Sequence, residues 1–289
     1  MSTKSVDSKH PVAVHWFRNG LRLHDNPSLL DACQNSSSIL PLYIIDPDAP
    51  FAQTAGIRAG AIRANFVLES IREMDQKLKE NNSRVVVLLG KPEVILPKVM
   101  EQIDATALYY EREPAAPIRE MDALVLDQID RKKVKIQGYD THTLHPMEHY
   151  LAHCKGGVAP STYGVFTKIF NQLKVPEEVP TINLDLLPPL PSSVHTIEQD
   201  GECPSMSDLG YDMKDVENRF KNGIEVVGGE DAAIALLDTM MKRTQWVCTF
   251  EKPKTSPNAL KIDTTGLSAC KFFVHYLSSL IPSFLLQLF

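Results

Sequence analysis

The chain has 289 residues, of which 43% are apolar, and a formal net charge of −6 at pH 7. This length and apolar content can bury one large hydrophobic core or two smaller ones. The acidic balance argues against nucleic-acid binding through bulk electrostatics, although it leaves room for a local basic groove. The five cysteines are scattered without C-x-x-C spacing, which argues against a disulfide framework or a zinc site and favours a reducing compartment.

Residues 1–10 are polar and lack the apolar segment of a secretory signal. We therefore expect a disordered N-terminus. The expected location is the nucleus or the cytoplasm, and an organelle reached by another address is the alternative.

Residues 11–137 alternate strand-like and helix-like runs. Apolar strand patterns occur at 12–17, 39–45, 84–89, 106–110 and 134–137. Between them, apolar residues recur at three- to five-residue steps over 62–78, 95–103 and 118–129, as they do in amphipathic helices. Because parallel strands need crossover connections, this alternation predicts an α/β fold with a doubly wound, parallel, five-stranded sheet and helices on both faces.

The first strand leads into a loop and then into a helix that begins at Asn26-Pro27. Asn is a favoured N-cap, and Pro is tolerated at the first helical position because its missing N–H would be unpaired there. In open α/β sheets, the loops at the carboxyl ends of strands bind ligands. We therefore expect this loop to form a crevice lined by Phe17, Arg18, Leu21 and Asp25.

After residue 137 come a polar loop, a short amphipathic helix at 163–173 and a proline-rich stretch over 175–191. Proline at this density blocks both helix and central strand, so we expect residues 138–205 to be an extended connector between domains. Helical signals resume near 232–246. The spacing of His145, His149 and His153 would place three imidazoles on one helix face, but Pro146 argues against that helix, and no metal site is predicted.

Several motifs in a fixed order indicate a family. The first is HWFRNGLRLHDNP at 15–27, and the last is WVCTFEKPK at 246–254 followed by DTTGLS at 263–268. Between them lie THTL at 141–144, GG at 156–157, PSMSDLGY at 204–211 and GGE at 228–230. In this order the motifs resemble the cryptochrome/photolyase family, specifically its animal-cryptochrome and (6–4) photolyase branch. The resemblance implies the Rossmann-like antenna domain of that family over residues 11–137.

The resemblance also implies an FAD site at the last motif, where short hydroxyl residues and one glycine can offer convergent donors to a diphosphate. Without the resemblance, the same residues would be read as an ordinary turn. The implied FAD contacts are Phe250, Thr264, Thr265, Gly266, Leu267 and Ser268. Some family members also carry an antenna chromophore, a deazaflavin or a folate, in the α/β domain. Its expected place here is the crevice of Phe17, Arg18, Leu21 and Asp25.

After Ser268 the resemblance ends. Residues 206–268 are expected to be only the start of a helical FAD-binding domain, followed by a divergent apolar tail over 269–289. The tail is interrupted by polar residues and falls short of the roughly 20 apolar residues that span a bilayer, so no membrane partner is expected. We expect a truncated form, from splicing or a gene-model error, that does not retain FAD stoichiometrically. No catalytic residue can be assigned.

The family implies light- and FAD-dependent repair of UV-damaged DNA, in which the damaged bases are flipped out beside the flavin. As a DNA photolyase (a carbon–carbon lyase), the truncated chain is predicted to be inactive alone. One alternative is a cryptochrome that acts as a blue-light photoreceptor or circadian transcription regulator through protein partners. Another is a non-catalytic antenna-domain isoform. The expected partners are therefore UV-damaged DNA or clock and signalling proteins.

Overall fold

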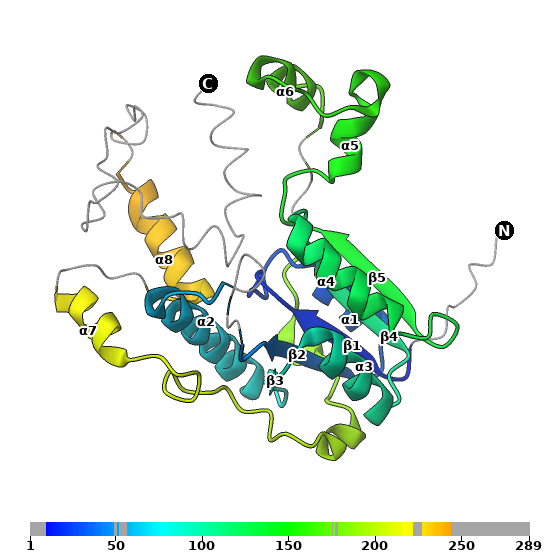
Figure 1. Ribbon diagram of the computed structural model, residues 1–289, viewed down its shortest axis with the longest axis vertical. Coiled ribbons are helices and arrows are strands. Elements are labelled where there is room, and N and C mark those ends of the chain that lie inside the picture. The colour runs from blue at the N-terminus through cyan, green and yellow to red at the C-terminus, as the bar shows by residue number, and fades with distance from the viewer. Residues whose placement is uncertain are drawn as a thin grey trace.

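The computed structural model describes residues 10–48, 51, 57–174, 176, 179–221, 227–243 and 245. A five-stranded sheet lies at the centre of this part of the chain (Figure 1). Its order is β3-β2-β1-β4-β5, and every neighbouring pair is parallel. The strands are β1 (Ala13–Phe17), β2 (Ile39–Ile45), β3 (Val86–Leu89), β4 (Ala107–Arg112) and β5 (Lys135–Asp140). The predicted doubly wound parallel sheet is therefore confirmed.

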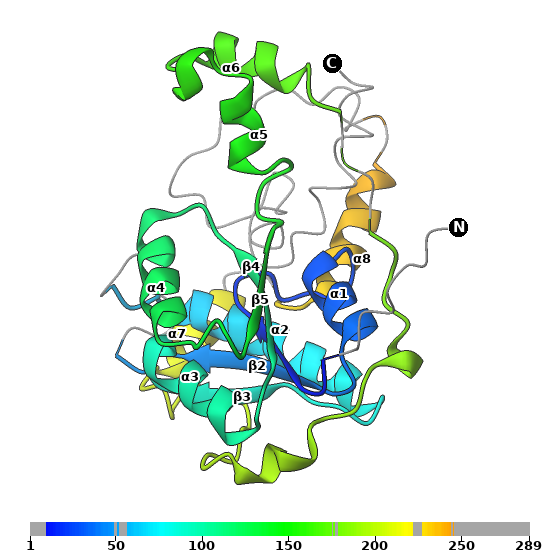
Figure 2. The same cartoon turned by 90° about the vertical axis from the view of Figure 1, so that its right-hand side faces the viewer.

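Helices cover both faces of the sheet (Figures 1 and 2). Because successive side chains of a strand point to opposite faces, β1 contributes to both cores. Phe17 packs with Leu29 and Phe66 on the face covered by the first two helices. Trp16 packs with Val125 on the other face, beneath the third and fourth helices. The helices are α1 (Pro27–Asn35), α2 (Ala61–Lys79), α3 (Pro92–Gln102) and α4 (Ala116–Asp127).

The predicted start of the first helix is confirmed. The Asn26 side chain accepts a hydrogen bond of 2.9 Å from the Leu29 backbone N–H, and Pro27 occupies the first helical position. This cap pairs one of the N–H groups that a helix start leaves without an internal partner. The cap thus fixes where the β1 loop ends.

Two strands extend further than the apolar pattern predicts. β4 runs to Arg112 rather than residue 110, and β5 runs to Asp140 rather than residue 137. The added residues fall outside the apolar pattern, but they continue the parallel ladder, in which Arg112 stands opposite Asp140. These two side chains also form an ion pair. The carboxyl edge of the sheet therefore carries charged residues on regular strands.

Two short helices, α5 (Met147–Ala152) and α6 (Tyr163–Phe170), rise beyond the carboxyl edge of the sheet (Figure 2). Rings of these helices pack together, with the Tyr150 and Phe166 centroids 5.4 Å apart. The following connector contains two short 3₁₀ turns, Leu184–Leu186 and Ser192–Thr196.

The connector then runs along the outer edge of β3. The Val87 N–H donates to the Gly201 carbonyl at 2.9 Å. The Gln199 side chain accepts from the Leu89 N–H at 2.8 Å and donates to the Leu89 carbonyl at 3.0 Å. The connector therefore pairs backbone groups that an edge strand would otherwise expose.

Helices α7 (Met213–Lys221) and α8 (Glu230–Met241) both pack on α2 (Figure 1). Within the described ranges, no helix combines the length and the apolarity that a membrane crossing requires. The domain boundaries expected from the sequence stay predictions.

Candidate functional site at the carboxyl edge of the sheet

The loops after β1 and β4 diverge from one another. The chain leaves β1 toward β2 over one face of the sheet and leaves β4 toward β5 over the other. A pair of adjacent strands with this property marks the crevice where open α/β folds bind ligands. The topology therefore places the candidate site between the β1 loop, residues 18–26, and the residues that follow β4.

Arg18 crosses this crevice. Its Nη1 donates to Asp122 Oδ1 of α4 at 2.6 Å, and its Nε lies 3.7 Å from Glu113 Oε1. The guanidinium carbon lies 4.8 Å from the Trp16 ring centroid and 5.9 Å from that of Tyr110. Arg18 is only 7% exposed, so two carboxylates and two aromatic faces compensate the burial of its charge.

Glu113 is the centre of the polar network on the β4 side. Asn19 Nδ2 donates to both carboxylate oxygens, at 3.0 and 2.8 Å. His142 Nε2 lies 3.5 Å from Glu113 Oε1. Burial lowers the pKa of His142, while Glu113 and Glu111 oppose that shift. The arrangement joins three loops of the carboxyl edge through one buried carboxylate.

A second buried pair joins the same loops nearer the sheet. Arg22 Nη2 lies 2.8 Å from Glu111 Oε1, and the Arg22 guanidinium also donates to the Asp25 carbonyl. The Thr141 hydroxyl donates to Glu111. Gly20 passes so close that an added Cβ would lie 1.8 Å from Glu111 Oε2. A side chain at position 20 would therefore displace the Glu111 carboxylate or the Arg22 guanidinium.

His15 lies buried on β1, 1% exposed and in edge contact with the Phe17 ring, whose centroid is 4.3 Å away. Neither ring nitrogen has a hydrogen-bond partner among the described residues. Burial lowers the pKa of His15 to about 4; nearby Glu111 opposes this shift and Arg22 adds to it. The imidazole is therefore neutral at physiological pH.

A cleft of about 510 Å³ opens beside this network, between α4, α5 and the ends of β4 and β5. Its volume lies in the range of small-molecule sites. Glu113, Asp122 and His142 of the network form part of its wall. The other lining residues are Tyr110, Arg112, Pro114, Arg119, Ala123, Leu126, Arg131, Asp140, Thr143, Met147, Glu148 and Leu151.

The structure places the four residues predicted to line the β1 crevice in different surroundings. Phe17 and Leu21 are buried in the core beside α1 and α2. Arg18 borders the cleft through its partners Asp122 and Glu113. Asp25 faces the connector, where its Oδ1 accepts from the Val179 N–H at 3.0 Å. Their role in chromophore binding stays a prediction.

Glu111, Glu113 and Asp122 were not singled out in the sequence, and His142 entered only as part of the THTL motif at 141–144. The signal that could have indicated the first two is Glu-Arg-Glu directly after the buried strand at 107–110. The implied FAD contacts, Phe250 and Thr264 to Ser268, lie outside the described residues.

The family model of DNA photolyase matches residues 13–183, which include the whole sheet and the cleft. This chain belongs to the cryptochrome/photolyase family. Among curated members, it is 31% identical over 280 residues to cryptochrome-1 of Spalax judaei, covering 93% of this chain and 46% of that protein. It is 32% identical over 259 residues to the (6-4)DNA photolyase of Arabidopsis thaliana, covering 88% and 45%.

The fold is likewise that of the family. The solved structure of the Synechocystis cryptochrome superposes with a TM-score of 0.64 at 26% identity, covering 83% of this chain and 48% of that one. The chain thus spans about half the length of the curated family members that it matches.

Proposed function

We propose that this chain supplies the antenna domain of a light- and FAD-dependent protein that repairs UV-damaged DNA, of the (6–4) photolyase type. The observation that carries the proposal is the ligand-sized cleft at the carboxyl edge of a photolyase-family sheet. A cryptochrome photoreceptor that acts through clock or signalling proteins is the second candidate. It is favoured by a 31% identity to cryptochrome-1, one percentage point below the 32% identity to the (6–4) photolyase.

The volume and lining of the cleft support a deazaflavin or a folate chromophore as its ligand. Tyr110 and Leu126 offer apolar contact area for a planar ring system. Arg119 and Arg131 lie on its wall, and neither forms an ion pair within the described ranges. They would hold an anionic group of the chromophore, such as the glutamate carboxylates of a folate. When bound, an antenna supplies light absorption and FAD supplies light-driven electron transfer.

Arg18 has a positioning role in this proposal. It fixes Asp122 and Glu113, both of which line the cleft, so the wall keeps its shape only while the buried ion pairs persist. FAD itself is proposed to contact Phe250, Thr264, Thr265, Gly266, Leu267 and Ser268.

Chromophore binding tests the antenna role. A deazaflavin and a folate are titrated into the full chain, and binding is followed by chromophore fluorescence. Arg131→Ala should weaken binding about 10-fold, as loss of one charge-assisted hydrogen bond predicts. Lys132→Ala removes the next positive charge along the chain, outside the cleft, and should leave the affinity unchanged. Equal effects of the two substitutions would place the chromophore elsewhere.

Repair and photoreception are separated by one illumination experiment. The full chain is supplied with FAD, a reductant and an oligonucleotide that carries a (6–4) photoproduct. Light-dependent reversal of the lesion supports repair. Photoreduction of bound flavin without reversal supports the cryptochrome alternative, and neither signal is expected if the chain serves as an antenna domain alone.

A further inference from the structure

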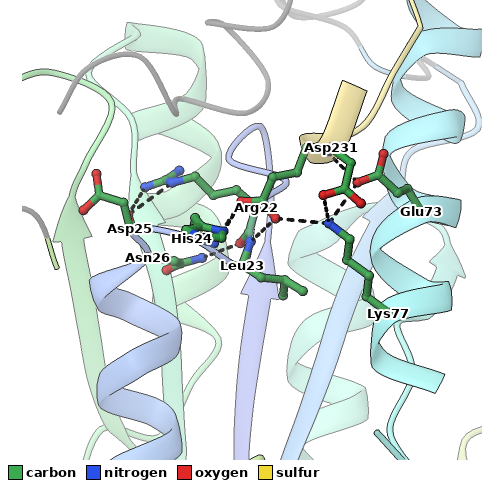
Figure 3. Close-up of polar contacts among 9 residues, drawn as sticks. Arg22, Leu23, His24, Asp25, Asn26, Glu73, Lys77 and Asp231 are labelled. Carbon is green, nitrogen blue, oxygen red and sulfur yellow. Dashed lines mark hydrogen bonds and ion pairs between the residues drawn. The ribbon is translucent and has the colours of Figure 1, made fainter. Parts of the chain in front are cut away.

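Backbone N–H groups of the β1 loop bind a carboxylate of the chain itself, that of Glu230. The Leu23 N–H donates to Glu230 Oε2 at 3.2 Å, and the His24 N–H donates to Glu230 Oε1 at 2.9 Å. Figure 3 shows the loop beside the residues of α2 that face it. Two successive backbone N–H groups directed at one carboxylate are the donor arrangement by which loops and helix starts bind phosphate.

Positive and titratable side chains complete the surroundings of this carboxylate. Lys77 Nζ of α2 lies 3.8 Å from Glu230 Oε2, and His24 Nδ1 lies 3.6 Å from Oε1. Glu230 is 5% exposed, so its charge is almost fully removed from water. Burial of a carboxylate is tolerated only when donors and a cation replace its hydration, as they do here.

Two glycines bring Glu230 to this place. An added Cβ on Gly228 would lie 2.0 Å from the Phe66 carbonyl oxygen, so the chain there lies directly against α2. Gly229 has φ +119°, a conformation that side chains other than glycine rarely adopt. The Asp231 N–H then donates to Glu73 Oε1 at 2.9 Å (Figure 3). The start of α8 is thereby docked on α2 with Glu230 reaching the β1 loop.

We propose that the Leu23 and His24 N–H groups, with Lys77 and the His24 imidazole, form an oxyanion-binding site, and that Glu230 is its built-in occupant. The ligand class is a phosphate-type oxyanion, since the site offers two N–H donors and the ammonium group of Lys77, which also pairs with Asp231 and Glu73. None of these residues lines the chromophore cleft. A free oxyanion and Glu230 compete for the same donors, so occupancy by one excludes docking of the other.

Stability measurements on the full chain test this site. Glu230→Ala removes the occupant and should lower the thermal midpoint. Inorganic phosphate raised to 50 mM at constant ionic strength should then raise that midpoint by about 3 °C through binding to the vacated donors. Asp231→Ala is the matched control, because Asp231 is the next residue, also pairs with Lys77 and has a 68% exposed side chain. Its response to phosphate should equal that of the unsubstituted chain.

Adding Lys77→Ala to Glu230→Ala should abolish the rise of the thermal midpoint that phosphate causes in Glu230→Ala. An equal response of Glu230→Ala and Asp231→Ala, or a rise that survives loss of Lys77, overturns the proposal. Glu230→Gln provides a test that leaves no cavity. Because the site selects negative charge, the thermal midpoint of Glu230→Gln should lie about 4 °C below that of the unsubstituted chain. An unchanged midpoint for Glu230→Gln also overturns the proposal.

Discussion

Replacement of Arg18 by leucine should destabilise the sheet far more than loss of an exposed charge. The substitution keeps most of the volume but leaves the Asp122 and Glu113 carboxylates buried without their cation. Removing one partner of a buried ion pair costs about 3–5 kcal/mol. Loss of contact with the Trp16 and Tyr110 rings adds about 0.5–1 kcal/mol. We therefore expect the free energy of unfolding to fall by about 4 kcal/mol.

The assay is urea unfolding at neutral pH, followed by circular dichroism, with Arg119→Leu on the exposed side of α4 as the control. The control should change stability by less than about 0.5 kcal/mol. The double substitution Arg18→Leu/Asp122→Leu should recover part of the loss, because it removes the unpaired carboxylate along with its cation. A loss below about 1 kcal/mol for Arg18→Leu alone, the value for a surface pair, would refute the reasoning.

A lower pH should reduce the loss of unfolding free energy that Arg18→Leu causes. Burial raises the pKa of Asp122, and Arg18 opposes that shift. Without Arg18, the folded-state pKa of Asp122 rises further above its unfolded value. A carboxyl group whose pKa is raised on folding destabilises the protein at pH values above its unfolded pKa and ceases to do so once it is protonated. The difference between the variant and the unsubstituted chain should therefore shrink as the pH falls.

Three further predictions concern other residues of the same edge. His15 has a folded pKa of about 4 against 6.5 unfolded, so acid protonates the unfolded state first. Stability should fall by about 3 kcal/mol as the pH drops through this window, and His15→Leu should remove that part of a pH series of urea midpoints. Gly20→Ala should displace the Glu111 carboxylate from Arg22 and cost about 3 kcal/mol in urea unfolding; a neutral effect would mean that the loop yields easily. Asn26→Ala should cost about 1 kcal/mol, while Asn26→Ser should restore most of it, because serine also caps a helix.

The sheet could be predicted because each strand and helix shows its own apolar pattern within a short segment of sequence. The run at 12–17 is apolar except for His15, as is typical of a strand buried on both faces, and β1 occupies residues 13–17. The helices between the strands show the 3.6-residue apolar period, and α1 begins at the predicted cap. The strand ends at Arg112 and Asp140 could not be predicted from apolar pattern, since they are held by pairing with each other.

The polar network could not be predicted from the sequence because its contacts join residues that are far apart along the chain. Arg18 meets Asp122 across 104 residues, and Asn19 meets Glu113 across 94. Which carboxylate pairs with which cation depends on the paths of the loops after β1 and β4. Apolar periodicity carries no information about those paths. The sequence predicted a ligand-binding role for Arg18, which stays a prediction, and gave no sign of its buried ion pairs with Asp122 and Glu113.

The contact between the β1 loop and Glu230 joins residues that are 206 and 207 positions apart. At about 5–20 residues per second, a ribosome needs roughly 10–40 s to synthesise the intervening chain. The last strand of the sheet ends at Asp140, so the sheet can assemble well before residue 230 has been made. The first loop of the fold is thus among the last to be completed. A nascent chain shorter than 230 residues carries the Leu23 and His24 N–H groups, and Lys77, without their carboxylate.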